Sequence, residues 1–117
     1  MSGLKRYDVI LVDFGKDVIG SEQGGIRPAV VVQNDTGNFF SDTTIVMPLT
    51  KHIKKLSQPT HTLIIKGRDN GLNCDSMAMA ECMRQISEER IIKVLGSVQN
   101  SHDQREIKRV YNASFGE

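Results

Sequence analysis

Residues 26–50 read IRPAVVVQNDTGNFFSDTTIVMPLT, which is two apolar runs separated by a polar segment. The runs at 29–33 and 43–49 are rich in Val, Ile and Thr, residue types that are typical of strands. The segment between them has turn-forming residues at both ends and room for a short helical turn at 38–40. This stretch therefore predicts two consecutive strands, and it makes the N-terminal half of the chain mainly β.

Two prolines set limits on these strands. Pro28 comes immediately before the first run, which suits a strand start because proline has no N–H to give to a strand ladder. Pro48 lies near the end of the second run and predicts an edge strand or a bulge there.

Three further strands are predicted outward from this stretch. Alternating or β-branched patterns predict them at 7–12, 60–66 and 75–86, with turn residues between them. Helices are expected only afterwards.

The first of the two predicted helices has Ser87 as its N-cap and ends at Gly96. The second begins with a capping box formed by Ser101 and Gln104 and runs toward Phe115. Five strands followed by two helices predict a mainly β, α+β fold, in which helices pack one side of a small curved antiparallel sheet or barrel.

Length and composition predict one soluble domain covering residues 1–117. The chain has 38% hydrophobic and 25% charged residues, and it lacks an apolar run of the roughly 20 residues that span a bilayer. No signal-peptide pattern is present, so a cytoplasmic location without membrane attachment is expected. Cys74 and Cys82 do not form a CxxC pair, so we expect free thiols and no structural zinc site.

The chain has no nucleotide-binding glycine loop, no GxSxG element and no paired-histidine metal motif. An enzyme with this sequence would work with few groups and no cofactor. Cleavage of RNA by its own 2′-hydroxyl meets that condition, because the substrate supplies the nucleophile. Arg27 suits such a reaction, since a guanidinium is always charged and can hold two phosphate oxygens. Taken alone, Arg27 would be interpreted first as an ordinary surface salt bridge.

A basic segment follows the third predicted strand. Residues 51–68 contain Lys51, Lys54, Lys55, Lys66 and Arg68 but no Asp or Glu. By itself the segment is compatible with a solvated loop or with a surface that holds phosphates.

Five elements together closely resemble the MazF/PemK family of toxins, the endoribonuclease halves of bacterial type II toxin–antitoxin pairs. These elements are GSEQGGIRP (20–28), VVVQND (30–35), TIVMPLT (44–50), QPTH (58–61) and DSMAMAECMR (75–84). The resemblance covers nearly the whole chain, and the first element is the most specific.

The resemblance implies an SH3-like small barrel with flanking helices that works as a homodimer. It also implies an mRNA interferase, which cuts single-stranded messenger RNA at short sequences without a metal or cofactor and so inhibits translation and growth. The expected products carry a 2′,3′-cyclic phosphate and a 5′-hydroxyl. The expected protein partner is a MazE-like antitoxin whose C-terminal segment lies along the dimer groove.

The same resemblance implies roles for individual residues. Arg27 and Thr50 match the family's catalytic arginine and threonine. Glu22 is either the general base or a group that orients Arg27, and both roles stay open; His52 could titrate but lies outside the family pattern. Cys82 stands where relatives often have glutamine, so the RNA sequence that is cut is not predicted. The candidate RNA-binding residues are Ser21, Gln23, Asn34, Phe39, Lys51, Lys54, Lys55 and Arg84.

Two alternatives are a gyrase-inhibiting CcdB-like toxin and a barrel that only binds RNA. The first depends on a C-terminal tryptophan, and this chain has no Trp. The presence of both Arg27 and Thr50 favours cleavage over binding alone.

Overall fold

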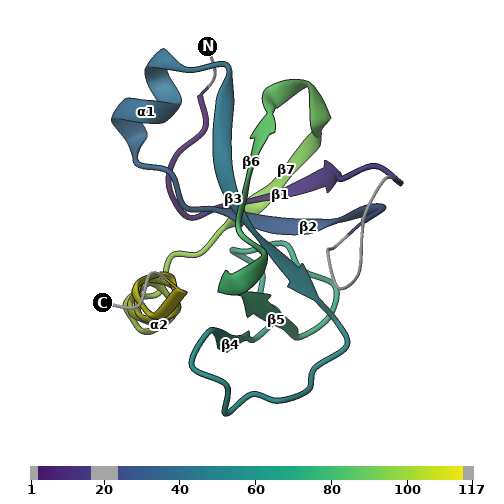
Figure 1. Ribbon diagram of the computed structural model, residues 1–117, viewed down its shortest axis with the longest axis vertical. Coiled ribbons are helices and arrows are strands. Elements are labelled where there is room, and N and C mark those ends of the chain that lie inside the picture. Colours follow the sequence, from purple (N-terminus) through teal and green to yellow (C-terminus); the bar gives the residue numbers. More distant parts are fainter. Residues whose placement is uncertain (1–2, 17–23, 115–117) are drawn as a thin grey trace.

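The computed structural model describes residues 3–16 and 24–114. Their strands form one curved antiparallel sheet in the order β4-β5-β3-β2-β1-β7, with β6 also paired to β3 (Figure 1). The strands are β1 (Asp8–Asp13), β2 (Ile26–Val31), β3 (Thr43–Thr50), β4 (His61–Ile64), β5 (Ser76–Met79), β6 (Arg84–Ser87) and β7 (Ile91–Ser97). The helices are α1 (Asp35–Phe40) and α2 (Ser101–Ser114), with short 3-10 helices η1 (Ala80–Cys82) and η2 (Glu88–Arg90).

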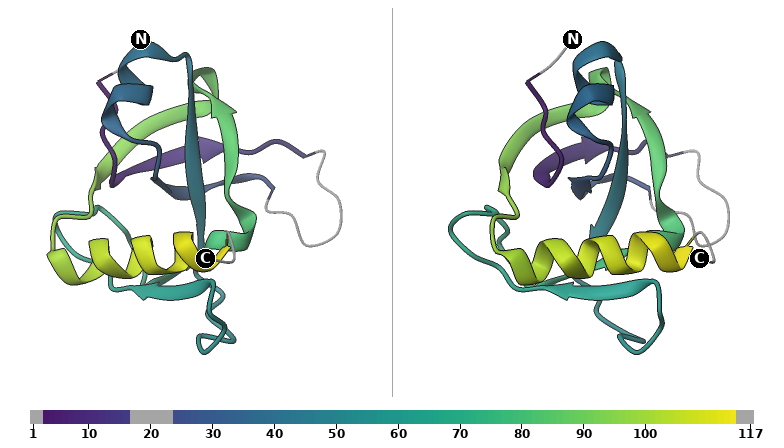
Figure 2. Two further views of the ribbon diagram at one scale, coloured as in Figure 1. Left: turned by 60° about the vertical axis from the view of Figure 1, so that its left-hand side comes forward. Right: turned by 90° about the vertical axis from the view of Figure 1, so that its left-hand side faces the viewer.

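Both faces of the central strands are buried. Val9 and Val30 belong to a core cluster with Ile107 and Val110 of α2, and α2 contacts β4 and η1 (Figure 2). The neighbouring residues point the other way, into a second cluster inside the curved sheet that includes Ile10, Val12, Val31 and Val46. Strands buried on both faces are apolar throughout, which explains the unbroken valine run of the sequence. Within the described ranges, no helix has both the length and the apolar character needed to cross a bilayer.

Strand β3 pairs with three other strands. It pairs with β2 through Val46–Pro48, with β6 through Thr43–Val46, and with β5 through Leu49 and Thr50. Pro48 falls between the residues that pair with β6 and those that pair with β5. The proline therefore marks the point where β3 changes partner, and not an outer edge of the sheet.

The predicted helix ending at Gly96 is wrong: residues 91–97 form β7, which pairs with β1. Ser87 does act as a cap, because its side chain accepts a hydrogen bond from the Glu89 backbone N–H, but it caps only the short η2. The β-branched residues Ile91, Ile92 and Val94 favour a strand. Their spacing also fits one face of a helix, but the pairing with β1 holds these residues in a strand.

Other boundaries also differ from the prediction. Strand β2 begins at Ile26, so Pro28 lies inside the strand, opposite Leu11 of β1, and does not mark its start. The strand expected at 75–86 is two strands, β5 and β6, separated by η1, because the chain must turn there to pass from one part of β3 to another. At α2 the cap is Asn100, whose Oδ1 accepts a hydrogen bond from the Asp103 N–H at 2.8 Å. Ser101 is the first residue of α2, so the cap at Asn100 lies one residue before the predicted N-cap. The short helix α1 and the strand 43–49 are confirmed.

Gly96 is required by a close backbone contact. The Ser97 N–H donates to the Asp69 carbonyl at 2.8 Å, which draws the 67–70 loop against β7. A Cβ atom added at Gly96 would lie 2.1 Å from the Asp69 oxygen and 2.7 Å from the Asn70 carbonyl carbon. Gly71 makes the reciprocal contact, since a Cβ there would lie 2.2 Å from the Leu95 oxygen.

The first prediction concerns this contact. Gly96→Ala forces two backbone segments apart, so we expect it to lower the free energy of unfolding by about 3 kcal/mol. Gly3→Ala is the control, because a Cβ at Gly3 meets no atom within 4 Å; it should change stability by less than about 0.5 kcal/mol. Urea unfolding followed by circular dichroism measures both, and equal stabilities would contradict the packing described here.

Candidate active site

Arg27 and Thr50 lie on adjacent strands. Strands β2 and β3 pair antiparallel as far as Ala29 opposite Pro48, and Arg27 and Thr50 each lie two residues beyond this last pair. Both side chains line the same open cavity, which has a volume of about 540 Å³. The pairing of two strands thus joins residues that are far apart in the sequence.

Thr50 is the last residue of β3, and its side chain is buried. Its Oγ1 accepts a hydrogen bond from the His52 backbone N–H at 3.1 Å. A hydroxyl has one donor and two acceptor lone pairs, so the Thr50 O–H still has its proton to donate while this contact is made. The loop after the strand therefore helps to fix the Thr50 hydroxyl at the cavity wall.

Arg27 is half-buried near the start of β2. Its Nε donates to the Gly24 carbonyl at 3.0 Å, which orients the planar guanidinium from its own strand. Gly25 has a φ of 74°, in the left-handed region that glycine adopts readily. Its N–H and carbonyl bond to Gly15 and Phe14, which holds the ends of β1 and β2 together beside Arg27.

The cavity wall is basic. Lys51, His52 and Lys93 line it together with Arg27, and its described lining residues contain no Asp or Glu. Such a wall attracts anions, because the lining side chains that the structure describes carry positive charge and no negative charge. Within residues 3–16 and 24–114, no group of three or more His, Cys, Asp or Glu side chains is placed to hold a metal ion.

Lys93 was not predicted. The sequence analysis placed it in a helix, whereas it lies in β7 opposite Leu11 of β1, and both residues line the cavity. The sequence signal for it is a single charged residue between Ile92 and Val94. A lysine within an apolar strand indicates a side chain whose charged end reaches solvent.

The predicted site residues Ser21, Glu22 and Gln23 lie outside the described residues. Lys51 lines the cavity, whereas Lys54 and Lys55 are exposed farther along the 51–60 loop and do not line it.

Asn34 is the N-cap of α1 and Phe39 lies within it, and α1 connects the end of β2 to the start of β3. Arg27 and Thr50 lie toward the opposite ends of these two strands. Asn34 caps α1 by accepting a hydrogen bond from the Gly37 N–H at 2.8 Å. Phe39 is 52% exposed and packs edge-on against the ring of Phe40. A role for either residue in RNA contact stays a prediction.

Arg84 also has a structural contact. Its guanidinium lies over the Phe14 ring, 5.5 Å from the centroid, which is cation–π geometry. Arg84 is therefore held close to the end of β1, and it does not line the cavity that contains Arg27 and Thr50.

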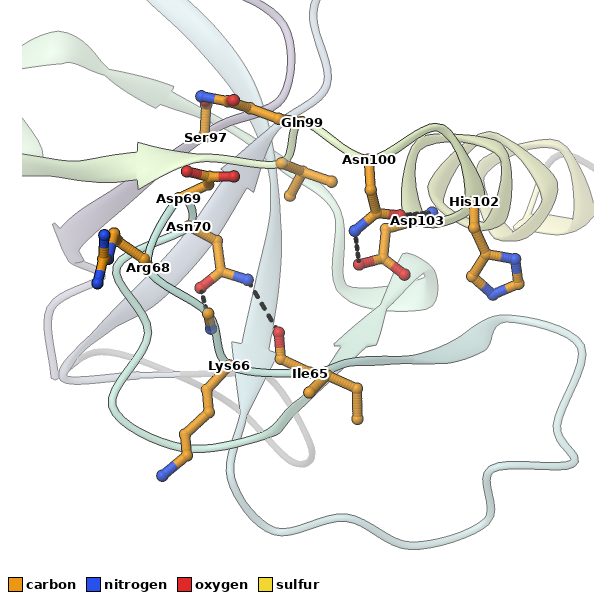
Figure 3. A pocket seen from close by; sticks show the side chains of 12 residues that line it. Ile65, Lys66, Arg68, Asp69, Asn70, Ser97, Gln99, Asn100, His102 and Asp103 are labelled. Atoms are coloured by element: carbon orange, nitrogen blue, oxygen red, sulfur yellow. Dashed lines mark hydrogen bonds between the residues drawn. The ribbon is translucent and has the colours of Figure 1, made fainter.

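A second hollow of about 360 Å³ lies between the 65–70 segment and the start of α2 (Figure 3). Its polar side chains bond mainly to each other and to nearby backbone: Asn70 bonds to the Gly67 N–H and the Ile65 carbonyl, and Asn100 bonds to Asp103. Lys66 and Arg68 extend outward from this cluster (Figure 3). The hollow is thus a structural hydrogen-bond cluster, and the basic cavity is the better candidate site.

The curved sheet, the flanking α2 and the basic cavity define a small barrel protein with an anion-attracting site. Residues 5–115 match the family described as "PemK-like, MazF-like toxin of type II toxin-antitoxin system". The chain therefore belongs to this family of toxins, as its sequence elements predicted.

Two relatives in sequence are named as endoribonucleases. Endoribonuclease EndoA of Bacillus subtilis is 44% identical over 88 residues, which are 75% of this chain and 74% of EndoA. Endoribonuclease MazF of Staphylococcus saprophyticus is 41% identical over 110 residues, which are 94% of this chain and 87% of that protein.

Solved structures confirm the small-barrel fold. A mycobacterial endoribonuclease in complex with its cognate antitoxin has a TM-score of 0.79 at 18% identity, with 97% of this chain and 96% of that chain covered. MazF of Deinococcus radiodurans has a TM-score of 0.78 at 18% identity, with 97% of each chain covered.

Proposed function

We propose that this toxin is a metal-independent endoribonuclease that cuts single-stranded messenger RNA at the Arg27–Thr50 cavity. The observation that carries the proposal is the placement of these two side chains on adjacent strands of a cavity whose described wall carries only basic charges. The names of the two relatives in sequence support the same activity.

The reaction proposed is a transesterification within the RNA. The 2′-oxygen forms a bond to phosphorus while the bond from phosphorus to the 5′-oxygen breaks. A base takes the 2′-hydroxyl proton, and the leaving 5′-oxygen gains a proton. The products carry a 2′,3′-cyclic phosphate and a free 5′-hydroxyl, and no water is consumed in this step.

The two cavity residues divide the work of this reaction. Arg27 stabilises the extra negative charge that develops on the phosphorane oxygens. Electrostatic stabilisation by preorganised donors is usually the largest single contribution to catalysis. The Thr50 hydroxyl makes one hydrogen bond, as donor or acceptor, to the scissile phosphate or the 2′-oxygen, but a hydroxyl is a poor base. Glu22 is the candidate base, with the orientation of Arg27 as its alternative role.

The surroundings of the cavity fit a flexible polyanion. Lys51 and Lys93 approach the cavity from two different elements, so the RNA backbone can be held on both sides of the scissile phosphate. We further propose that the toxin works in the bacterial cytoplasm as a homodimer and is inhibited by a MazE-like antitoxin. A relative in structure is an endoribonuclease solved with its cognate antitoxin, which supports that partnership.

The second prediction tests the two catalytic residues. Purified protein should cut a mixed RNA in the presence of EDTA, and Arg27→Ala or Thr50→Ala should lower kcat about 10²- to 10³-fold. Arg27→Lys should also be impaired, because lysine keeps the charge but loses the planar pair of donors. Gel analysis of 5′-labelled RNA and mass spectrometry of the product ends measure these effects.

Three results would contradict the proposed chemistry. They are unchanged cleavage by Arg27→Ala, loss of cleavage in EDTA, and products that end in a 3′-hydroxyl. Binding without cleavage by the parent protein would favour an RNA-binding barrel in its place.

The third prediction concerns Lys93. Lys93→Gln should weaken binding of a 2′-O-methylated single-stranded RNA about threefold and reduce the slope of log affinity against log salt by about 0.7, the value expected for one lost phosphate contact. Lys66→Gln is the matched control, because Lys66 lines the second hollow and not the basic cavity. Fluorescence anisotropy at several salt concentrations measures both; equal slopes in the two variants would remove Lys93 from the RNA path.

A further inference from the structure

The loop that follows Thr50 is fastened at its far end by a buried histidine. His61 begins β4, and its imidazole Nε2 lies 2.6 Å from Oε2 of Glu81 in η1. Its Nδ1 lies 2.9 Å from the backbone carbonyl of Lys55, in the middle of the 51–60 loop. The ring thus connects the loop to the body of the barrel.

Both partners of the His61 ring are oxygen atoms that only accept. A carboxylate and a backbone carbonyl have no proton to donate. Each contact is a hydrogen bond when the ring nitrogen that faces it has a proton, and the Nε2–Oε2 contact is also an ion pair when the ring is charged.

Glu81 is suited to be the anionic partner. Burial by itself would raise the pKa of its carboxyl group, but hydrogen bonds from His61, from its own backbone and from Thr60 outweigh the burial and lower the pKa below the usual value. Glu81 is therefore a carboxylate at neutral pH.

The loop also has an unusual conformation at the point where the histidine holds it. Lys55 has a φ of 54°, in the left-handed region that residues with a side chain rarely adopt. Its carbonyl accepts the His61 bond and a second hydrogen bond from the Gln58 N–H at 3.0 Å. These two hydrogen bonds stabilise a backbone conformation that is unfavourable for a residue with a side chain.

Other side chains close the same end of the loop. The Gln58 amide donates to the Thr60 hydroxyl at 3.0 Å and to Glu81 at 3.4 Å. From α2, Arg109 donates to the backbone carbonyls of Pro59 at 3.3 Å and His61 at 3.4 Å. Three elements, η1, β4 and α2, therefore hold the end of a loop whose beginning contacts Thr50 directly.

Neither His61 nor Glu81 takes part in the cleavage chemistry, although each lies in one of the sequence elements QPTH and DSMAMAECMR. We propose that the His61–Glu81 pair is a positioning device, which holds the 51–60 loop so that Lys51, Lys54 and Lys55 face RNA entering the cavity. Both are positioning residues, since they act through the loop. The inference rests on the proposed function, because it assigns these lysines to RNA.

The test compares two conservative variants with matched controls. His61→Gln and Glu81→Gln remove the ion pair while keeping the side chains polar. We expect each variant to raise KM for a short single-stranded RNA about tenfold and to change kcat less than about twofold. The lost contacts are at Lys55 and Glu81, whereas Thr50 stays in β3 and keeps its pairing with β5. His102→Gln on α2 and Glu89→Gln on η2 are the same substitutions at exposed positions and should leave both constants unchanged.

Hydrogen exchange in the same variants separates this inference from the proposed function. Exchange at residues 53–58 should become about tenfold faster in Glu81→Gln while the central strands keep their protection, since local opening reports local contacts. Glu81 is 41% exposed, so this variant should fold even if His61→Gln does not. Unchanged KM together with unchanged loop exchange in Glu81→Gln would overturn the inference. A parent protein that does not cut RNA would overturn the proposed function, and the exchange result would still decide whether the pair holds the loop.

Discussion

The candidate site depends on the pairing of β3 with strands on both of its edges. Strand β2 lies along one edge, while β6 and β5 follow each other along the opposite edge. This arrangement buries β3 almost completely and leaves its last residue, Thr50, at the point where the chain leaves the sheet. A catalytic group must be held closely to work, and a strand paired on both sides is a rigid support. The pairing of β3 with β2 brings Arg27 to the wall of the cavity that Thr50 also lines.

The fold could be predicted from the sequence where local pattern and tertiary structure agree. The apolar runs at 29–33 and 43–49 lie largely within the buried strands β2 and β3, so the prediction for the stretch between Arg27 and Thr50 is largely correct. The helix prediction for residues 87–96 is wrong because the apolar residues at 91, 92, 94 and 95 fit a helix face as well as an irregular strand. The register shifts of β7 against β1 also break the simple alternation that would have indicated a strand. Gly96 looked like a helix stop, whereas its role is a contact with Asp69 that only the folded chain shows.

Site residues that lie inside short sequence elements could be predicted, whereas residues that reach the site only through tertiary contacts could not. Arg27 and Thr50 each lie inside a recognisable element, and the pairing of two consecutive strands brings both to the same cavity. Lys93 was missed because its position depends on β7, the element that was assigned wrongly. The role of the His61 ring could not be read from the sequence at all, since its two partners, Glu81 and the Lys55 carbonyl, are defined only by the fold.

The charge of the cavity is a local property and not a consequence of overall composition. The chain has a net charge of only +1, and charges farther away than about 8 Å are largely screened at physiological salt. An anion entering the cavity therefore responds chiefly to the groups on its wall, which come from β2, from β7 and from the start of the loop after β3.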